Sequence, residues 1–100
     1  MKRYEGKRAD SQTVVTVNGL PLDPRLDLCN HSPTGFEWGY RGCGPAQLAL
    51  ALLADALGND ATASRWYQVF KAKVVAGLPM QGWLLTDDEI RQTVQSLATT

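Results

Sequence analysis

The sequence has no surplus of charge of either sign, because ten Lys and Arg residues offset ten Asp and Glu residues. This balance argues against a protein that coats nucleic acid through general positive charge and against an acidic disordered tail. No apolar run reaches the ~18 residues of a membrane span, since Gln47 and Asp55 interrupt the longest one. The charged N-terminus, Met1 to Glu5, has no apolar segment behind it, so we expect a cytoplasmic protein without a secretory signal.

Cysteine is also scarce. Cys29 and Cys43 are too few for a disulfide scaffold, and in a cytoplasmic protein we expect two reduced thiols. A metal site is an alternative, because Cys29, His31 and Cys43 supply three soft ligands. A structural zinc site takes four ligands, however, and this spacing matches no standard zinc finger. The sequence therefore predicts neither a metal nor a cofactor.

The length of 100 residues is typical of one domain, and we expect residues 1–100 to form a single domain. With 44% apolar residues, the chain can form one modest core. β-branched and turn-forming residues dominate the first half, and helical patterns dominate the second. This order predicts an α+β fold in which a small antiparallel sheet of two to four strands packs with three helices.

A β-hairpin is predicted near the N-terminus. Asn18-Gly19 directly follows a β-branched run and favours a type I′ turn, because both residues tolerate positive φ. Pro21 and Pro24 lack the donors of a regular ladder, so the returning segment is predicted to be an irregular edge. The predicted strands are residues 2–8, 13–17 and 82–85.

Three helices are predicted in the second half. The first is apolar on nearly every side, which indicates a helix buried all round, with Leu50 and Leu53 in the core. It is expected to begin at Pro45, since proline suits the first helical position. Thr86 and Glu89 have the spacing of a capping box at the start of the last helix. The three helices are predicted at about residues 45–57, 60–76 and 87–98.

A long loop, residues 29–44, precedes the first helix, and loops of this length in compact domains tend to be functional. Gly42 and Gly44 lie at the helix start, where free N–H groups and the helix dipole favour an anion that Arg41 could also bind. The pattern is neither a P-loop nor a dinucleotide fingerprint. An alternative explanation is that the glycines let the loop pass close to the buried helix.

A nucleophilic site is an alternative interpretation of the same loop. Cys43 at a helix start has a setting that lowers thiol pKa values, and His31 with Glu37 or Asp27 would complete a Cys-His-acid arrangement. Only the composition of the loop supports this arrangement. We therefore expect a protein without enzymatic activity.

The aromatic residues divide into two groups. Trp66, Tyr67 and Phe70 have helical spacing and are predicted to lie in the core. Trp38 and Tyr40 share one side of an extended segment, where nucleic-acid bases could stack on them. Because the neighbouring helix needs cover, we expect Trp38 against the core and Tyr40 between core and solvent.

The loop and the first helix contain the pattern Phe-Glu-Trp-Gly-Tyr-x-Gly-x-Gly-Pro-Ala-Gln-Leu-Ala, residues 36–49. Further matching positions are found at Tyr67, Phe70, Trp83 and Leu85. With these residues the chain resembles a small uncharacterised domain family of bacteria, archaea, phages and mobile elements. That family commonly has serine where Cys43 stands, which argues against a thiol or metal function for this residue.

The resemblance implies a mobile-element setting, in which small domains often inhibit host defence systems. We therefore expect a non-enzymatic interaction protein, such as an anti-CRISPR-like inhibitor, that occupies a surface of a host protein or ribonucleoprotein complex. The alternatives are an anion- or nucleotide-binding module and a nucleic-acid-binding accessory protein. No membrane partner is expected. The predicted binding residues, chosen for interface aromatics, cations and the glycine loop, are Trp38, Tyr40, Arg41, Gly42, Gly44, Lys71 and Lys73.

Overall fold

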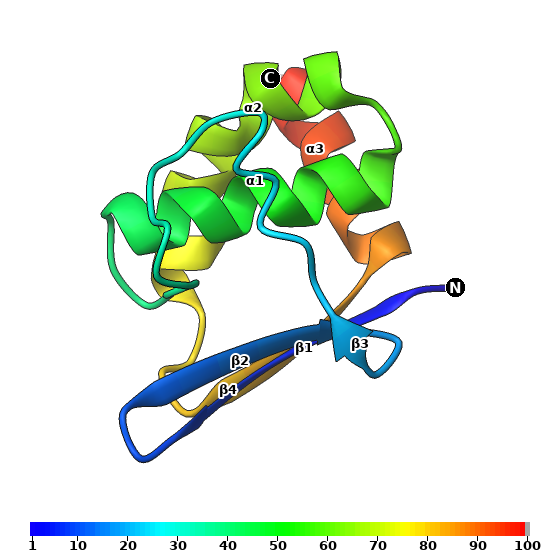
Figure 1. Cartoon of the computed structure of the whole chain (residues 1–100). Helices are drawn as coiled ribbons and strands as arrows, with labels where there is room; N and C mark the ends of the chain where they lie inside the picture. Colours follow the sequence, from blue (N-terminus) through cyan, green and yellow to red (C-terminus); the bar gives the residue numbers. More distant parts are fainter. Residues whose placement is uncertain (100) are drawn as a thin grey trace.

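The computed structural model describes residues 1–99, in which three α-helices cover one face of a four-stranded antiparallel sheet (Figure 1). The strands are β1 (Arg3–Ala9), β2 (Gln12–Val17), β3 (Leu20–Pro21) and β4 (Gly82–Thr86), in the spatial order β3-β2-β1-β4. The helices are α1 (Cys43–Leu57), α2 (Asp60–Lys73) and α3 (Asp87–Ala98), with a 3₁₀ turn η1 (Val75–Gly77) after α2. The predicted α+β fold is therefore confirmed.

Two tight turns connect the first three strands. Asn18 and Gly19 both have positive φ, at 50° and 83°, so the predicted hairpin turn is present. Asp10 and Ser11 form an equivalent two-residue turn, with φ of 52° and 63°. Short polar residues adopt this left-handed backbone more readily than others.

β3 is only two residues long, as expected of a segment with two prolines. Leu22 still donates from its backbone N–H to the carbonyl of Val15, at 3.1 Å, and its side chain is buried. The chain then leaves the sheet and crosses to the helices. We call this crossing segment, residues 22–42, the entry loop.

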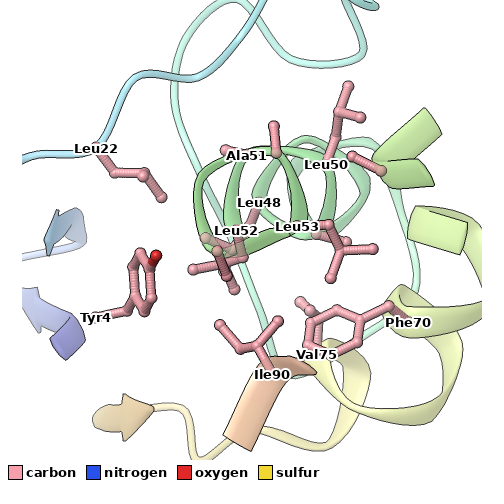
Figure 2. Packing of buried hydrophobic residues seen from close by; sticks show 14 of the residues in the cluster. Tyr4, Leu22, Leu48, Leu50, Ala51, Leu52, Leu53, Phe70, Val75 and Ile90 are labelled. Carbon is pink, nitrogen blue, oxygen red and sulfur yellow. The ribbon is translucent and has the colours of Figure 1, made fainter. Parts of the chain in front are cut away.

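α1 lies at the centre of the core (Figure 2). Four of its five leucines are fully buried, and Phe70 from α2, Ile90 from α3 and Tyr4 from β1 pack around it. The helix begins at Cys43, two residues before the predicted start, because the backbone already turns into the helix after Gly42. The buried leucines are Leu48, Leu50, Leu52 and Leu53.

α2 ends at Lys73 instead of near residue 76, which corrects the predicted boundary. The carbonyls beyond its end are bonded to the entry loop: Val75 accepts from the N–H of Gly39 at 3.0 Å, and Pro79 accepts from the indole of Trp38 at 2.9 Å. Pro79 has no N–H to donate to the carbonyl of Val75, so a regular α-helix cannot continue through this segment. The segment therefore forms a single 3₁₀ turn.

α3 covers the predicted range, and its capping box is confirmed. The hydroxyl of Thr86 accepts from the N–H of Glu89, and the Glu89 carboxylate accepts from the N–H of Thr86 at 2.9 Å. Both bonds satisfy donors that a helix start leaves free. This reciprocal pair fixes the point at which β4 becomes α3.

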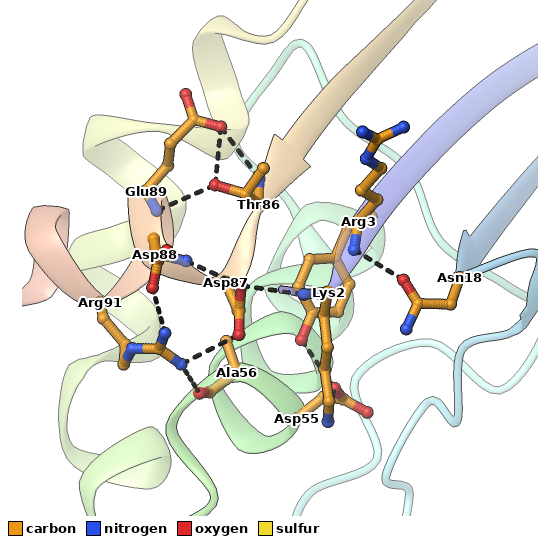
Figure 3. A network of polar contacts seen from close by, with 11 residues as sticks. Lys2, Arg3, Asn18, Asp55, Ala56, Thr86, Asp87, Asp88, Glu89 and Arg91 are labelled. Atoms are coloured by element: carbon orange, nitrogen blue, oxygen red, sulfur yellow. Dashed lines mark hydrogen bonds and ion pairs between the residues drawn. The ribbon is translucent and has the colours of Figure 1, made fainter.

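A polar network joins β1 to α1 and α3 (Figure 3). Asp55 accepts from the Tyr4 hydroxyl at 2.6 Å and from the Lys2 ammonium at 2.9 Å. Burial, together with the bond to Asp55, raises the pKa of Tyr4. Burial alone would raise the pKa of Asp87, but bonds from the Lys2 N–H and the Arg91 guanidinium outweigh it and lower that pKa. The network ties the N-terminal strand to the helical layer.

Candidate functional site

The first half of the entry loop is held by one buried amide, that of Gln47 on α1. Its side-chain oxygen accepts from the N–H groups of His31 at 2.8 Å and Ser32 at 3.1 Å. Its nitrogen donates to the carbonyls of Pro24 at 2.5 Å and Cys29 at 3.1 Å. Gln47 is fully buried, so this amide replaces the ladder bonds that the loop backbone lacks.

The second half of the entry loop is held by Arg8 of β1. The guanidinium makes a bidentate ion pair with the Glu37 carboxylate, with N···O distances of 2.7 and 3.3 Å, and lies 5.0 Å from the ring centroid of Trp38. The hydrogen bond to Glu37 raises the pKa of Arg8. The Trp38 ring also meets Trp83 edge to face at 5.5 Å. Pair geometry, cation–π contact and ring packing together fix this part of the loop.

Trp38 is fully buried, as expected from its side of the segment. The prediction that Trp38 contacts a partner directly is therefore wrong, because a side chain with no exposed surface cannot reach a partner. The ring belongs to the same buried cluster as the leucines of α1. Trp38 therefore holds the loop in place, and the residues that a partner can reach are its neighbours Tyr40 and Arg41.

Close packing explains the glycines at the start of α1. A β-carbon on Gly44 would lie 2.7 Å from the β-carbon of Glu37, and one on Gly42 would lie 2.8 Å from the Tyr40 ring. Both distances are shorter than any normal contact. Gly44 is buried, and a side chain there would push the loop away from α1. The geometry favours a packing function for both glycines.

Next to the start of α1, the exposed residues of the entry loop are Tyr40 and Arg41. Tyr40 is 47% exposed, between core and solvent as predicted, and Arg41 is exposed beside it. Lys71 is half-buried and Lys73 exposed in the last turn of α2. Only two residues join α1 to α2, so the helices run antiparallel and the last turn of α2 lies near the first turn of α1.

The structure therefore brings Tyr40, Arg41, Lys71 and Lys73 to one end of the helical layer, which we call the basic end. The hydrogen bond from Gly39 to Val75 joins the two segments directly. Within residues 1–99, none of the three cations has an ion pair, and the first turn of α1 has no acidic residue. The cations that do have acidic partners are Lys2, Lys7, Arg8, Arg25 and Arg91. The basic end therefore keeps its charge free.

The histidine and the two acids of the alternative nucleophilic site are bonded to other residues. His31 pairs through Nε2 with the Tyr67 hydroxyl at 2.7 Å, and burial raises the pKa of that tyrosine. Glu37 and Asp27, the acids that could orient His31, are each paired with an arginine. Cys43 is exposed at the start of α1. Across residues 1–99, no group of three His, Cys, Asp or Glu side chains is placed to hold a metal ion.

Residues of all three helices line a groove that the sequence pattern does not predict. Trp66 and Tyr67 were predicted to lie in the core, but both are half-buried, and only Phe70 is fully buried. Helical spacing predicts which residues share one face of a helix, but how deeply that face is buried depends on where α3 packs. Trp66 lines one side of the resulting groove of about 450 Å³. Its other lining residues include Leu57, Thr62, Arg91, Val94 and Ala98.

A comparison with known protein families identifies the family of this chain. A family described as "Family of unknown function (DUF6166)" matches residues 4–96. The chain belongs to this family. No curated protein and no solved structure matches it. The match includes the entry loop, the basic end and nearly all of α3, so these features lie within the family domain. Among residues 1–99, no helix is long and apolar enough to cross a membrane.

Proposed function

We propose that this protein is a non-enzymatic interaction protein that binds a larger partner through the basic end. The observation that carries the proposal is that Arg41, Lys71 and Lys73, which have no ion pair within residues 1–99, lie with the half-exposed Tyr40 on two segments joined by the hydrogen bond from Gly39 to Val75. Arginine and tyrosine are enriched among the residues that dominate binding energy. The loop beneath them is already fixed by Gln47 and Arg8, so little entropy is lost when a partner binds.

The positive charge of the basic end indicates the kind of surface that the partner would present. Unpaired cations favour an acidic patch, which would speed association and select against basic surfaces. We propose a host protein or ribonucleoprotein complex as the partner. The setting would be the host cytoplasm, with the domain encoded by a phage or mobile element and inhibiting a defence system. An inhibitor of this kind needs a surface that blocks a site and no catalytic groups. The contacts of Glu37 and Asp27 with arginines, and of His31 with Tyr67, agree with this.

The test pairs a binding measurement with a stability measurement. The partner is captured from a bacterial lysate on immobilised protein, identified by mass spectrometry and purified. Arg41→Ala should weaken its binding by about 1 kcal/mol or more, which is about fivefold in Kd. Its unfolding free energy should stay within about ±0.5 kcal/mol of wild type. Arg3→Ala is the matched control, because Arg3 is also exposed and has no ion pair within residues 1–99.

Trp38→Ala should behave in the opposite way to Arg41→Ala. Loss of this buried ring should cost about 3–5 kcal/mol of stability, while binding per folded molecule is retained. The proposal is wrong if Arg41→Ala unfolds the protein and leaves binding per folded molecule unchanged. A steep salt dependence of binding to DNA or RNA would favour the nucleic-acid alternative. Shifts of the Cys43 and Gly44 amide resonances with inorganic phosphate would favour the anion-binding alternative.

A further inference from the structure

β4 is an edge strand that lacks the usual protection against pairing with another strand. Within residues 1–99 it pairs with β1 alone. Figure 1 shows the helices on one face of the sheet, and we call the other face the outer face. Its sequence, Gly82 to Thr86, contains no charged residue and no proline. Natural edge strands are commonly protected by such residues or by being short. The other edge, β3, has two residues and includes Pro21.

Two residues of β4 direct their backbone groups to the open edge. The N–H of Arg8 donates to the carbonyl of Gln81 at 3.2 Å, which identifies Gln81 as a residue bonded to β1. Residues of an antiparallel strand alternate in the side to which their N–H and C=O groups point. The odd-numbered residues of β4 therefore bond to β1. Gly82 and Leu84 present their donors and acceptors to the solvent.

We propose that β4 pairs antiparallel with β4 of a second copy of this chain, about a two-fold axis at Trp83. In this register Gly82 of each copy lies opposite Leu84 of the other. Each of these residue pairs exchanges both main-chain hydrogen bonds, so all the open backbone groups of both residues are satisfied. A register centred on Leu84 would instead place Gly82 opposite Thr86, whose N–H is already bonded to Glu89 at 2.9 Å.

The side chains on the outer face fit the same register. Leu84 is 59% exposed and lies opposite Glu5 of β1, while Gly82 lies opposite Lys7. In the dimer, Leu84 of one copy covers the bare backbone of Gly82 in the other. The row across the dimer then reads Glu5, Leu84 and, from the second copy, Gly82 and Lys7. Opposite charges thus flank the apolar contact, and no like charges face one another. This self-complementarity is the reason for choosing a second copy as the occupant.

The dimer should be weak and dependent on concentration. One short strand pair buries less than the ~1,200 Å² of a stable interface. The contact uses none of the residues of the basic end. Dimerisation is therefore compatible with partner binding there and would present two basic ends in one particle.

The test combines sedimentation velocity with amide hydrogen exchange, from about 10 µM to about 1 mM protein. We expect a dimer at high concentration, with exchange slowed at Gly82 and Leu84. Leu84→Lys should keep the monomer folded, since the new cation lies beside Glu5. In the dimer it is a charge at the strand interface, beside Gly82 of the second copy and with Lys7 of that copy one strand further, so the dissociation constant should rise at least about tenfold. Val14→Glu is the control, because Val14 is 57% exposed on the same outer face, away from the edge.

A second variant tests the backbone bonds. Leu84→Pro removes a donor that the monomer does not use, and proline is tolerated at such edge positions. It should abolish the dimer while the circular dichroism spectrum is retained. A monomer at about 1 mM with unchanged exchange at both amides would overturn the proposal and leave the edge to a strand of another protein. A dimer that persists in Leu84→Lys would also overturn it. If Leu84→Lys fails to fold, the exchange measurement on the wild type decides.

Discussion

Replacement of Gln47 by alanine should destabilise the protein more than its polar side chain alone would suggest. The substitution leaves the N–H groups of His31 and Ser32 and the carbonyls of Pro24 and Cys29 without their partner. Each such bond contributes a net ~0.5–1.5 kcal/mol. Water can reach part of the loop and offset some of this loss. We therefore expect a cost of about 3 kcal/mol, a large share of the ~5–15 kcal/mol of a small domain.

Chemical denaturation followed by circular dichroism measures this loss. Thermal melting of Gln47→Ala should show a midpoint about 10–20 °C below that of the wild type for a chain of this length. Gln92→Ala is the matched control, because Gln92 is an exposed glutamine of α3. Its unfolding free energy should stay within about ±0.5 kcal/mol of wild type. Amide exchange should also speed up in the entry loop of Gln47→Ala and remain slow in the sheet.

The variant Gln47→Glu separates hydrogen bonding from volume, because glutamate has nearly the same shape. A carboxylate at this buried position would face the carbonyls of Pro24 and Cys29, so its folded-state pKa would be raised above the ordinary value. Such a group destabilises most when it is ionised. The variant should therefore be nearer to wild type at about pH 3.5 and fall further below it as the pH rises past the ordinary glutamate pKa of about 4.3.

Two results would refute this reasoning. A loss below about 1 kcal/mol in Gln47→Ala would show that water replaces the amide without cost. A Gln47→Glu variant whose deficit is independent of pH would show that the side chain is not held against the two carbonyls. In either case the first half of the entry loop would depend on some other contact.

Three further predictions concern the core, the thiol and the polar network. Leu53→Ala should cost about 2–5 kcal/mol in chemical denaturation, since Leu53 is fully buried, and a loss below about 1 kcal/mol would show that α1 is not central. Cys43→Ser should keep fold and partner binding, because Cys43 is exposed and its hydrogen-bonding needs are small; loss of binding with an intact fold would assign the thiol a function. Asp87 has a lowered pKa, so its stabilising contacts with Lys2 and Arg91 are present above the unfolded pKa of about 3.9 and are lost as pH falls below it. The stabilities of the wild type and Asp87→Asn should therefore converge in acid, and a constant difference between pH 7 and pH 2.5 would contradict this assignment.

Much of the fold could be predicted from local sequence. The Asn18-Gly19 turn and the Thr86–Glu89 capping box both formed where they were expected, because each depends on a few adjacent residues. The apolar run of α1 also predicted its burial, since a helix without a polar face has no side to leave in water. These features are decided by backbone preference and by the amount of apolar surface, which the sequence states directly.

The entry loop and the basic end were decided by the tertiary structure. Trp38 is buried, and not a contact residue, because Arg8 lies over its ring and is held there by Glu37, 29 residues away in the sequence. Gln47 binds a carbonyl 23 residues before it, and nothing in either local sequence indicates that pair. Arg41 and Lys73 gather at one end only because α1 and α2 fold back on each other. Such contacts depend on which distant segments share one core, so local residue patterns supply the parts while packing determines which of them meet.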